Sequence, residues 1–352
     1  MERYVGVDAH AASCTLAVVG ASGKRIKSIV VETNGRALVE AVKGIGGQLH
    51  ICLEEGTQSA WLYELLEPHA AEVVVIVAPE TKGPKSDVRD AWTRAEELRV
   101  GAIRTRAYNE APQHFAALHN AVRAQLMAVR DLTRAKNRLK AVWRSRGVMP
   151  DRSIYNADGR EKWLKSLPAP YRLLAQWLGR QIEALEPVRD EAEEWLVREA
   201  KTHPIIRKLS TTPGLGTVRT AQVVAIVADP HRFRTRQQFW SYCGLGIVTR
   251  SSSDWVRDKR GQWLRAEVQQ TRGLSRKRNG VLKAVFKGAA TTVITQMVDH
   301  PLHAGYQRML EAGIKPNLAR LTLARRIAAI VLSMWKHKEV YGPQRQAIAV
   351  KA

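Results

Sequence analysis

Acidic residues at four places in the first ninety positions are the part of this sequence best suited to chemistry. Asp8 ends the apolar run of residues 4–7, and Glu54 and Glu55 follow a second apolar run. Asp87 and Asp90 stand three residues apart, so they share one face of a predicted helix. Ionised carboxylates that are buried or crowded together need a positive partner, because desolvation and mutual repulsion oppose their charge.

A divalent metal ion is the partner that this set of side chains favours. Mg²⁺ prefers hard oxygen ligands, and two such ions can assist phosphodiester cleavage by activating the attacking oxygen and stabilising the leaving one. Each acid also has an ordinary explanation, since Asp87 and Asp90 suit the start of a helix and either glutamate suits solvent. The metal hypothesis becomes specific only if the fold brings these acids together.

The elements that would position the acids follow the order of a ribonuclease H-like α/β domain. We predict strands at 3–7, 13–20 and 25–32, then alternating helices and strands at 35–43, 49–53, 59–66, 72–77 and 84–100. In that fold the first and fourth strands are neighbours, and the last helix packs across their ends. Asp8, one of the two glutamates, Asp87 and Asp90 should therefore converge. No GxGxxG motif supports a dinucleotide-binding sheet instead.

The rest of the chain is predicted to be mainly helical. Residues 113–146 contain neither Gly nor Pro and carry apolar residues at helical spacing, and a second helical stretch covers 171–201 with a break or kink at Pro187. This pair forms either an antiparallel arm, with the option of a coiled coil between subunits, or two helices of a compact bundle. We therefore divide the chain into domains at 1–110, 111–203 and 204–352.

The segment TPGLGTVRTAQVVAIV, residues 212–227, predicts a helix-hairpin-helix at the start of the third domain. Gly214 and Gly216 would form the turn, and the free amides of the following helix could face a phosphate. An ordinary connection between two helices explains the same Gly-x-Gly spacing.

Positive charge is concentrated in the last two thirds of the chain. The protein has 352 residues and a formal charge of +23. Residues 1–110 hold 13 Lys/Arg and 15 Asp/Glu, whereas residues 111–352 hold 43 and 18, a net of +25. A positive field of this size favours a polyanion such as DNA or RNA, and we expect its nucleic-acid affinity to fall steeply with salt.

The longest apolar stretches are too short to cross a bilayer, and the N-terminus lacks the pattern of a signal peptide. Cys14, Cys52 and Cys243 lie far apart, which suggests neither a disulfide framework nor a metal motif. These features predict a cytoplasmic protein without a membrane partner.

Five segments of the chain together resemble one family. YVGVDAHAASCTLAVV, LEEGTQSAWLYELL and PKSDVRDAWTRAEELR are similar, in this order, to the N-terminal blocks of the DEDD-type transposases of bacterial insertion sequences, the group that includes the Piv DNA invertase. PGLGTVRTAQVVAIVADPHRFRTRQQFWSYCGLG and GLSRKRNGVLKAVFKGAATTV resemble the C-terminal domain of that family.

The resemblance implies a metal-dependent DNA transposase or recombinase with a RuvC-like domain, a coiled-coil arm and a C-terminal serine nucleophile. It also implies that a structured guide RNA, the bridge RNA of some members, pairs with target and donor DNA. Carried onto this sequence, the metal-binding tetrad is Asp8, Glu55, Asp87 and Asp90. Glu55 is preferred to Glu54 because the family block reads Glu, a small residue and Thr, as Glu55-Gly56-Thr57 does here.

The same resemblance assigns the nucleophile by register to Ser252, with Ser251 and Ser253 as alternates. The family shows Ser-Gly at this place, whereas this chain has no glycine in Ser251-Ser252-Ser253-Asp254. That departure leaves both the choice of serine and the activity of this copy open. Attack on DNA would give a phosphoserine link, and nearby cations would neutralise the phosphate. Those cations are Arg250, Arg257, Lys259 and Arg260.

We expect the acids and the serine to form one composite site, shared between the end domains of different subunits in a dimer or tetramer. A helix over 113–146 would reach about 50 Å, enough to carry the C-terminal domain away from its own sheet. Two other functions compete with this one: a Holliday-junction-resolvase-like metal nuclease that uses water, and a nucleic-acid-binding protein without catalysis.

Overall fold

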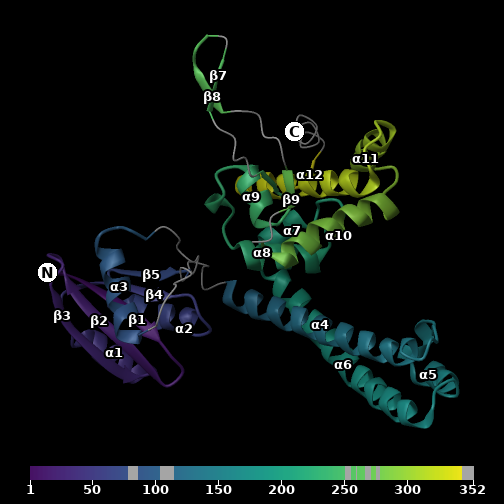
Figure 1. Cartoon of the computed structure of the whole chain (residues 1–352), viewed down its shortest axis with the longest axis horizontal. Coiled ribbons are helices and arrows are strands. Elements are labelled where there is room, and N and C mark those ends of the chain that lie inside the picture. Colours follow the sequence, from purple (N-terminus) through teal and green to yellow (C-terminus); the bar gives the residue numbers. More distant parts are fainter. Residues whose placement is uncertain are drawn as a thin grey trace. The chain divides into compact units, whose positions relative to one another are not determined.

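The computed structural model describes residues 1–77, 86–103, 115–249, 255–258, 260–265, 271–274 and 278–342 (Figure 1). It divides into two compact units, Met1–Ala111 and Pro112–Ala352. The predicted boundary between 203 and 204 lies inside the second unit and stays a prediction.

The first unit is built on a five-stranded mixed sheet with the order β3-β2-β1-β4-β5. β1 is antiparallel to β2 and parallel to β4, β3 is antiparallel to β2, and β5 is parallel to β4. This topology is compatible with the predicted ribonuclease H-like domain, and the predicted adjacency of the first and fourth strands is confirmed. The strands are β1 (Glu2–Ala9), β2 (Ser13–Gly20), β3 (Arg25–Glu32), β4 (Gln48–Glu54) and β5 (Glu72–Ile76).

Helices cover both faces of this sheet. The strand alternation of β1 turns Val5 and Val7 into a core shared with α1 (Gly35–Lys43) and α2 (Ser59–Leu66). The opposite face packs against α3 (Asp87–Arg99), which buries Leu98 on it.

The contact between β1 and α3 is close enough to need a glycine. A Cβ atom added to Gly6 would lie 1.9 Å from the carbonyl oxygen of Ala91 and 2.7 Å from the amide nitrogen of Ala95. The α3 backbone therefore rests directly on the β1 backbone, and both alanines are fully buried. Because side chains alternate along a strand, Asp8 lies on the same face as Gly6, toward α3.

The second unit is mainly helical. Two long helices, α4 (Ala116–Arg144) and α6 (Ala169–Lys201), run side by side (Figure 1). Leu118 near the start of α4 and Leu196 near the end of α6 belong to one core, whereas Leu139 and Ala175 belong to another. The two helices are thus antiparallel, as the arm prediction required.

Pro187 lies within α6 and does not end it. Proline removes one helical hydrogen bond to the carbonyl four residues earlier. Pro187 is exposed, so water can reach that carbonyl, and the break predicted at this residue does not occur.

Apart from α5, the remaining helices surround the larger core of the second unit, in which α8, α10 and α12 bury the most apolar residues, whereas α5 packs on the smaller core that holds Leu139 and Ala175. Four short strands pair as two separate ribbons, β6 with β9 and β7 with β8. These helices are α5 (Ala157–Leu164), α7 (Pro204–Leu209), α8 (Thr217–Val227), α9 (Arg236–Tyr242), α10 (Gly280–Gln296), α11 (Pro301–Glu311) and α12 (Pro316–His337). The strands are β6 (Ile247–Thr249), β7 (Trp255–Arg257), β8 (Trp263–Arg265) and β9 (Thr271–Leu274).

Within the described residues, short 3₁₀ turns lie at Glu67–His69, Arg152–Tyr155 and Pro230–Arg232. Cys14, Cys52 and Cys243 are buried, and none of the three forms a disulfide. Among the described helices, none combines the length and apolar composition that a bilayer crossing requires.

Candidate functional site

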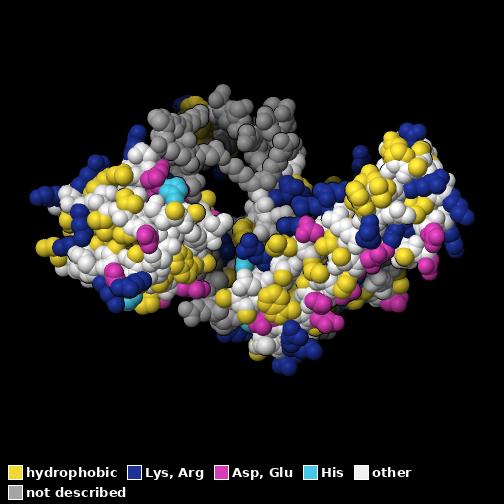
Figure 2. All heavy atoms as spheres, turned by 90° about the horizontal axis from the view of Figure 1, so that it is seen from below, with side chains coloured by type: hydrophobic (Ala, Val, Ile, Leu, Met, Phe, Trp, Pro, Cys, Tyr) yellow, Lys and Arg dark blue, Asp and Glu magenta, His cyan; other side chains and the backbone are white. Residues whose placement is uncertain are grey.

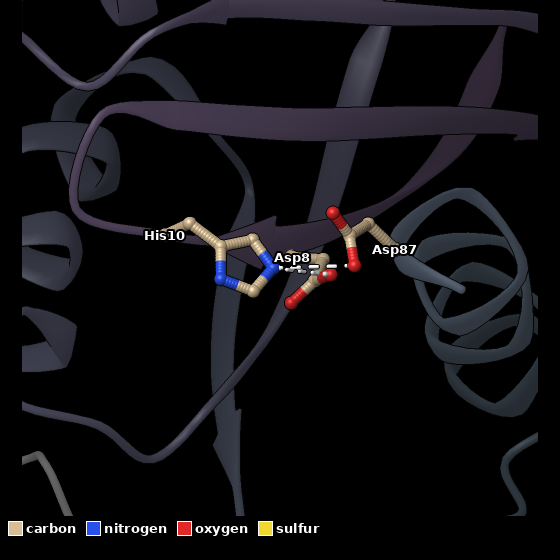
Figure 3. A group of neighbouring side chains, drawn as sticks. All are labelled: Asp8, His10 and Asp87. Atoms are coloured by element: carbon tan, nitrogen blue, oxygen red, sulfur yellow. Dashed lines mark hydrogen bonds and ion pairs between the residues drawn. The ribbon is translucent and has the colours of Figure 1, made fainter. Parts of the chain in front are cut away.

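Asp8, His10 and Asp87 form a compact polar group at the end of β1 (Figure 3). The His10 Nε2 atom lies 3.3 Å from Asp8 Oδ2 and 3.3 Å from Asp87 Oδ1. One ligand atom from each of the three residues lies within 4.8 Å of the others. Asp8 is partly buried, whereas His10 and Asp87 are exposed, so the group is open to solvent on one side.

The contact between β1 and α3 explains why Asp8 and Asp87 meet. Asp87 is the first residue of α3, and Ala91, which touches the backbone at Gly6, lies four residues later on the same helix face. Asp8 lies two residues beyond Gly6 on the same strand face. The helix start is therefore held beside the strand end by a contact one turn away.

Electrostatics in this group favour a positively charged partner. Burial raises the pKa of Asp8, the nearby carboxylates of Asp87 and Glu54 raise it further, and His10 opposes the rise. The pKa of His10 is raised above its ordinary value chiefly by the charge of Asp8, with Asp87 adding to the effect. A protonated His10 can balance the two aspartates, and a deprotonated His10 leaves a ring nitrogen free to bind a metal.

The donor set of this group fits a divalent metal ion. Asp8 and Asp87 supply the carboxylate oxygens that Mg²⁺ and Mn²⁺ prefer, whereas an imidazole nitrogen suits later transition metals better. His10 contacts Asp8 through a hydrogen bond. With a metal bound, it could either keep that hydrogen bond or ligate the metal through a ring nitrogen.

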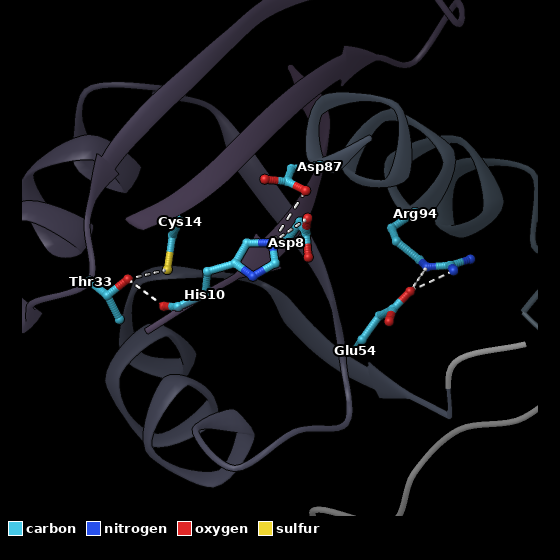
Figure 4. Close-up of polar contacts among 7 residues, drawn as sticks. All are labelled: Asp8, His10, Cys14, Thr33, Glu54, Asp87 and Arg94. Atoms are coloured by element: carbon cyan, nitrogen blue, oxygen red, sulfur yellow. Dashed lines mark hydrogen bonds and ion pairs between the residues drawn. The ribbon is translucent and has the colours of Figure 1, made fainter. Parts of the chain in front are cut away.

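The two glutamates at the end of β4 lie in different surroundings, and Figure 4 shows Glu54 beside Arg94. Glu54 accepts hydrogen bonds from Arg94 of α3, with Nε at 2.8 Å and Nη2 at 2.6 Å from Glu54 Oε1. The Arg94 side chain is only 4% exposed, and it also donates to Glu97. Glu55 is exposed, and its backbone amide donates to the Ile76 carbonyl of β5.

Two of the four predicted acids, Asp8 and Asp87, are thus brought together directly. Glu55 and Asp90 lie at the ends of neighbouring elements but do not belong to the group of Asp8, His10 and Asp87, which is the one such group among the described residues. Their assignment as metal ligands stays a prediction.

Sequence reasoning overlooked His10 and the ion pair between Glu54 and Arg94. His10 had a usable signal, because a residue two places after Asp8 in extended chain points to the same side. The signal for Arg94 was weaker. A buried arginine needs an acidic partner, but only the packing of α3 shows which acid that partner is.

The predicted nucleophile lies outside the described residues. Ser251, Ser252 and Ser253 are not described, and neither are Arg250 and Lys259. Of the four predicted cations, the described residues include Arg257 and Arg260, which both belong to the β7–β8 ribbon.

The β7–β8 ribbon carries these arginines beside exposed tryptophans. Arg257 pairs with Trp263 across the strands, with its guanidinium carbon 4.8 Å from the Trp263 ring centre. Trp255 and Trp263 are 59% and 57% exposed. The backbone amide of Arg260 donates to Asp258 in the turn. Basic and aromatic groups that share one exposed face are typical of surfaces that bind single-stranded nucleic acid.

The predicted hairpin connects α7 and α8. Gly214 has φ +78°, and a Cβ atom there would lie 2.3 Å from the Ala289 carbonyl oxygen of α10. Gly216 precedes the first residue of α8 and has open space around it. Packing alone explains Gly214, so a phosphate contact at this turn stays a prediction for Gly216.

Comparison with known proteins identifies two matching regions. Residues 5–145 match the family model DEDD_Tnp_IS110, described as a transposase. Residues 206–307 match the model described as the transposase family of IS116, IS110 and IS902. No curated protein matches the chain. The first region contains every predicted metal-binding acid, and the second contains the predicted serine.

Proposed function

Because the chain carries two IS110-family transposase domains, we propose that it is the transposase of an insertion sequence, cleaving and rejoining DNA. The observation that carries this proposal is the pair of family matches in one chain. The group of Asp8, His10 and Asp87 inside the first match supports it.

The metal centre of the proposed enzyme is formed by Asp8, Glu55, Asp87 and Asp90, with His10 beside them, and Mg²⁺ is its metal. These residues would hold a divalent ion, which would supply stabilisation of the charge that develops on the oxygens of a scissile phosphate. The close packing of β1 on α3 holds Asp8 and Asp87 near each other, so part of the site is preorganised. The pair of Arg94 and Glu54 ties α3 to the end of β4, next to Glu55, and thereby positions both elements.

The nucleophile of the proposed reaction is Ser252, with Ser251 and Ser253 as alternates. Its Oγ forms a bond to phosphorus while the bond from phosphorus to a deoxyribose oxygen breaks. The hydroxyl proton leaves to a base, and the departing oxygen takes up a proton. The phosphoserine ester conserves the bond, so a second DNA end can reverse the step and be joined. Arg257 and Arg260, with Arg250 and Lys259, neutralise the phosphate.

Nucleic acid is bound mainly by residues 111–352, which hold the positive charge. DNA is the substrate, and a structured RNA is the guide that selects it. The exposed Trp255 and Trp263 beside Arg257 offer stacking surfaces for unpaired bases.

A second copy of this chain is the proposed partner of α6. Leu173, Leu174, Trp177 and Val188 of this helix are exposed by 44% to 57% of their surfaces. Figure 2 shows hydrophobic side chains among lysines and arginines on the surface of the second unit. Burying such residues against an identical helix would form a coiled coil and a dimer, or a tetramer from two dimers.

Complementation between two inactive variants tests this function. We expect Asp8→Ala and Ser252→Ala each to abolish strand cleavage with DNA, guide RNA and Mg²⁺. A mixture should regain a covalent protein–DNA adduct, because a shared site in a mixed dimer holds one intact set of acids and one serine.

The other functions give different results in the same assay. Cleavage without an adduct, retained in Ser252→Ala and lost in Asp8→Ala, identifies a metal nuclease that uses water. Full biological activity of Asp8→Ala identifies a binding protein without catalysis. If mixed dimers form and no adduct appears, the site is not shared between subunits.

A further inference from the structure

A pocket of about 630 Å³ lies in the second unit, between α4, α8 and the start of α10. Its polar lining comes from Arg130, Arg219, Gln222 and Arg278. Leu126 and Val285 are among its apolar walls. None of these residues belongs to the predicted metal centre or to the serine segment.

The pocket is positively charged, and the described residues that line it include no acid. Arg130 is exposed and forms no hydrogen bond or ion pair with the described residues. Arg219 donates only to neutral acceptors, the Gly214 carbonyl at 2.8 Å and Thr292 Oγ1 at 3.0 Å. Its charge is therefore not neutralised by either bond.

Further cations adjoin the pocket along α10. The pKa of Lys283 is lowered by burial and by the charges of Arg278 and Lys287. The start of α10 also belongs to the lining, through Asn279, Gly280 and Val281, and the helix dipole adds positive potential there. Repulsion among these groups would be relieved by an anion.

The lining favours a phosphate over a whole nucleotide. Among the described residues no aromatic side chain belongs to it, so a base would find no aromatic ring there to stack on. Arginine presents a planar set of donors that matches two phosphate oxygens at once. Gln222 is buried and held by a 3.0 Å hydrogen bond to Gln125 Oε1, which places a further polar side chain in the wall.

We propose that this pocket binds a backbone phosphodiester of a nucleic-acid strand, with Arg130, Arg219 and Arg278 as the ligand-binding cations. This inference rests on the proposed function, because it takes the strand to be part of the DNA or RNA on which the transposase acts. DNA and RNA offer the same phosphodiester, and separate measurements with each decide which strand occupies the pocket.

Ala284 allows a test that removes no existing contact. It is exposed, lines the pocket and is the fifth residue of α10. Ala284→Glu places a negative charge among the arginines, and Ala284→Gln adds a side chain of the same size without charge. An acid near a helix N-terminus does not destabilise the helix, so the melting temperature of Ala284→Glu should not fall below that of Ala284→Gln.

A second pair of variants removes one cation. Arg130→Gln removes a pocket arginine that has no ion pair with the described residues, and Arg138→Gln removes an exposed arginine of the same helix that does not line the pocket. One lost phosphate contact lowers the salt slope by about 0.9 for duplex DNA and about 0.7 for a single strand. If the variant and the unaltered chain bind alike at 1 M salt, the variant should bind at 0.1 M salt about eightfold more weakly to a duplex and about fivefold more weakly to a single strand than the unaltered chain does.

Binding is measured on the full chain with a DNA duplex, a DNA single strand and a structured RNA, over a range of salt concentrations. We expect Ala284→Glu and Arg130→Gln to weaken binding of at least one of these ligands by about fivefold or more, while Ala284→Gln and Arg138→Gln stay within twofold of the unaltered chain.

Three results would overturn the pocket assignment. The first is that both pocket variants bind every ligand as their controls do. The second is that Ala284→Glu and Ala284→Gln weaken binding equally. The third is that inorganic phosphate slows amide hydrogen exchange of the pocket residues, whereas none of the nucleic-acid ligands does so. Failure of the unaltered chain to bind any nucleic acid would instead refute the proposed function.

Discussion

Replacing Gly6 with alanine should separate Asp87 from Asp8 without touching either residue. The added methyl group would lie 1.9 Å from the Ala91 carbonyl oxygen, whereas real Cβ atoms essentially never lie closer than 3.0 Å to another heavy atom of this kind. The new Cβ atom on β1 would clash with backbone atoms of α3, so no side chain can rotate away to relieve the clash. The helix must move by at least about 1 Å, and Asp87 moves with it.

The sign of the stability change distinguishes this mechanism from an ordinary glycine effect. Replacing a glycine with alanine at a compatible position stabilises a protein by about 0.4–1 kcal/mol, because the unfolded chain loses freedom. Overpacking at a close contact costs about 1–3 kcal/mol. We therefore expect net destabilisation of the first unit, with a fall in melting temperature of about 4–8 °C per kcal/mol for a unit of this approximate size.

The effect on function should exceed the effect on stability. A displacement of about 1 Å at a reacting centre can cost on the order of 100-fold in rate. We expect Gly6→Ala to weaken binding of Mn²⁺, used as the metal probe and measured by calorimetry, and to lower strand cleavage to this extent.

Gly20→Ala serves as the matched control, since its Cβ atom would meet its nearest neighbour, Ile26, at an ordinary 3.5 Å. Hydrogen exchange of peptides covering Glu2–Ala9 and Asp87–Arg99 locates the change in the full chain. If Gly6→Ala matches Gly20→Ala in exchange protection, metal affinity and cleavage, the contact between β1 and α3 does not hold Asp87 beside Asp8.

Three further predictions concern single side chains. Because Asp8 raises the pKa of His10, the ring takes up a proton as the pH falls through that raised pKa, and the protonated ring then competes with a metal. The affinity for Mn²⁺ should therefore fall in that pH range, and His10→Gln should make the affinity depend less on pH. An unchanged pH profile of the His10→Gln variant would exclude His10 from the site. Trp263→Ala should weaken binding of single-stranded nucleic acid by about 1–3 kcal/mol if a base stacks there, measured against Leu264→Ala on the other strand face of β8, and equal effects of the two would argue against stacking. Trp177→Asp should shift the sedimentation of the full chain toward the monomer because it places a charge in the apolar α6 face, and an unchanged oligomer would show that subunits associate elsewhere.

Local patterns in the sequence were sufficient for most of the secondary structure. The strands of the first unit and the long helices α4 and α6 were predicted within a few residues, because apolar periodicity reflects contacts that each element must make. Pro187 shows where a local rule fails, since an exposed proline can remain inside a helix that is packed on its other side.

The sequence by itself determined the elements and their order, the concentration of positive charge beyond residue 110, and the convergence of Asp8 with Asp87, since β1 and the last helix of this topology must meet. Only the tertiary structure decided that His10 joins these acids and that Arg94 neutralises Glu54 rather than Glu55. It also decided that Arg130, Arg219 and Arg278 line one pocket. The physical reason is that such contacts join side chains far apart in the chain or at the ends of elements, where no periodicity reports which atoms meet.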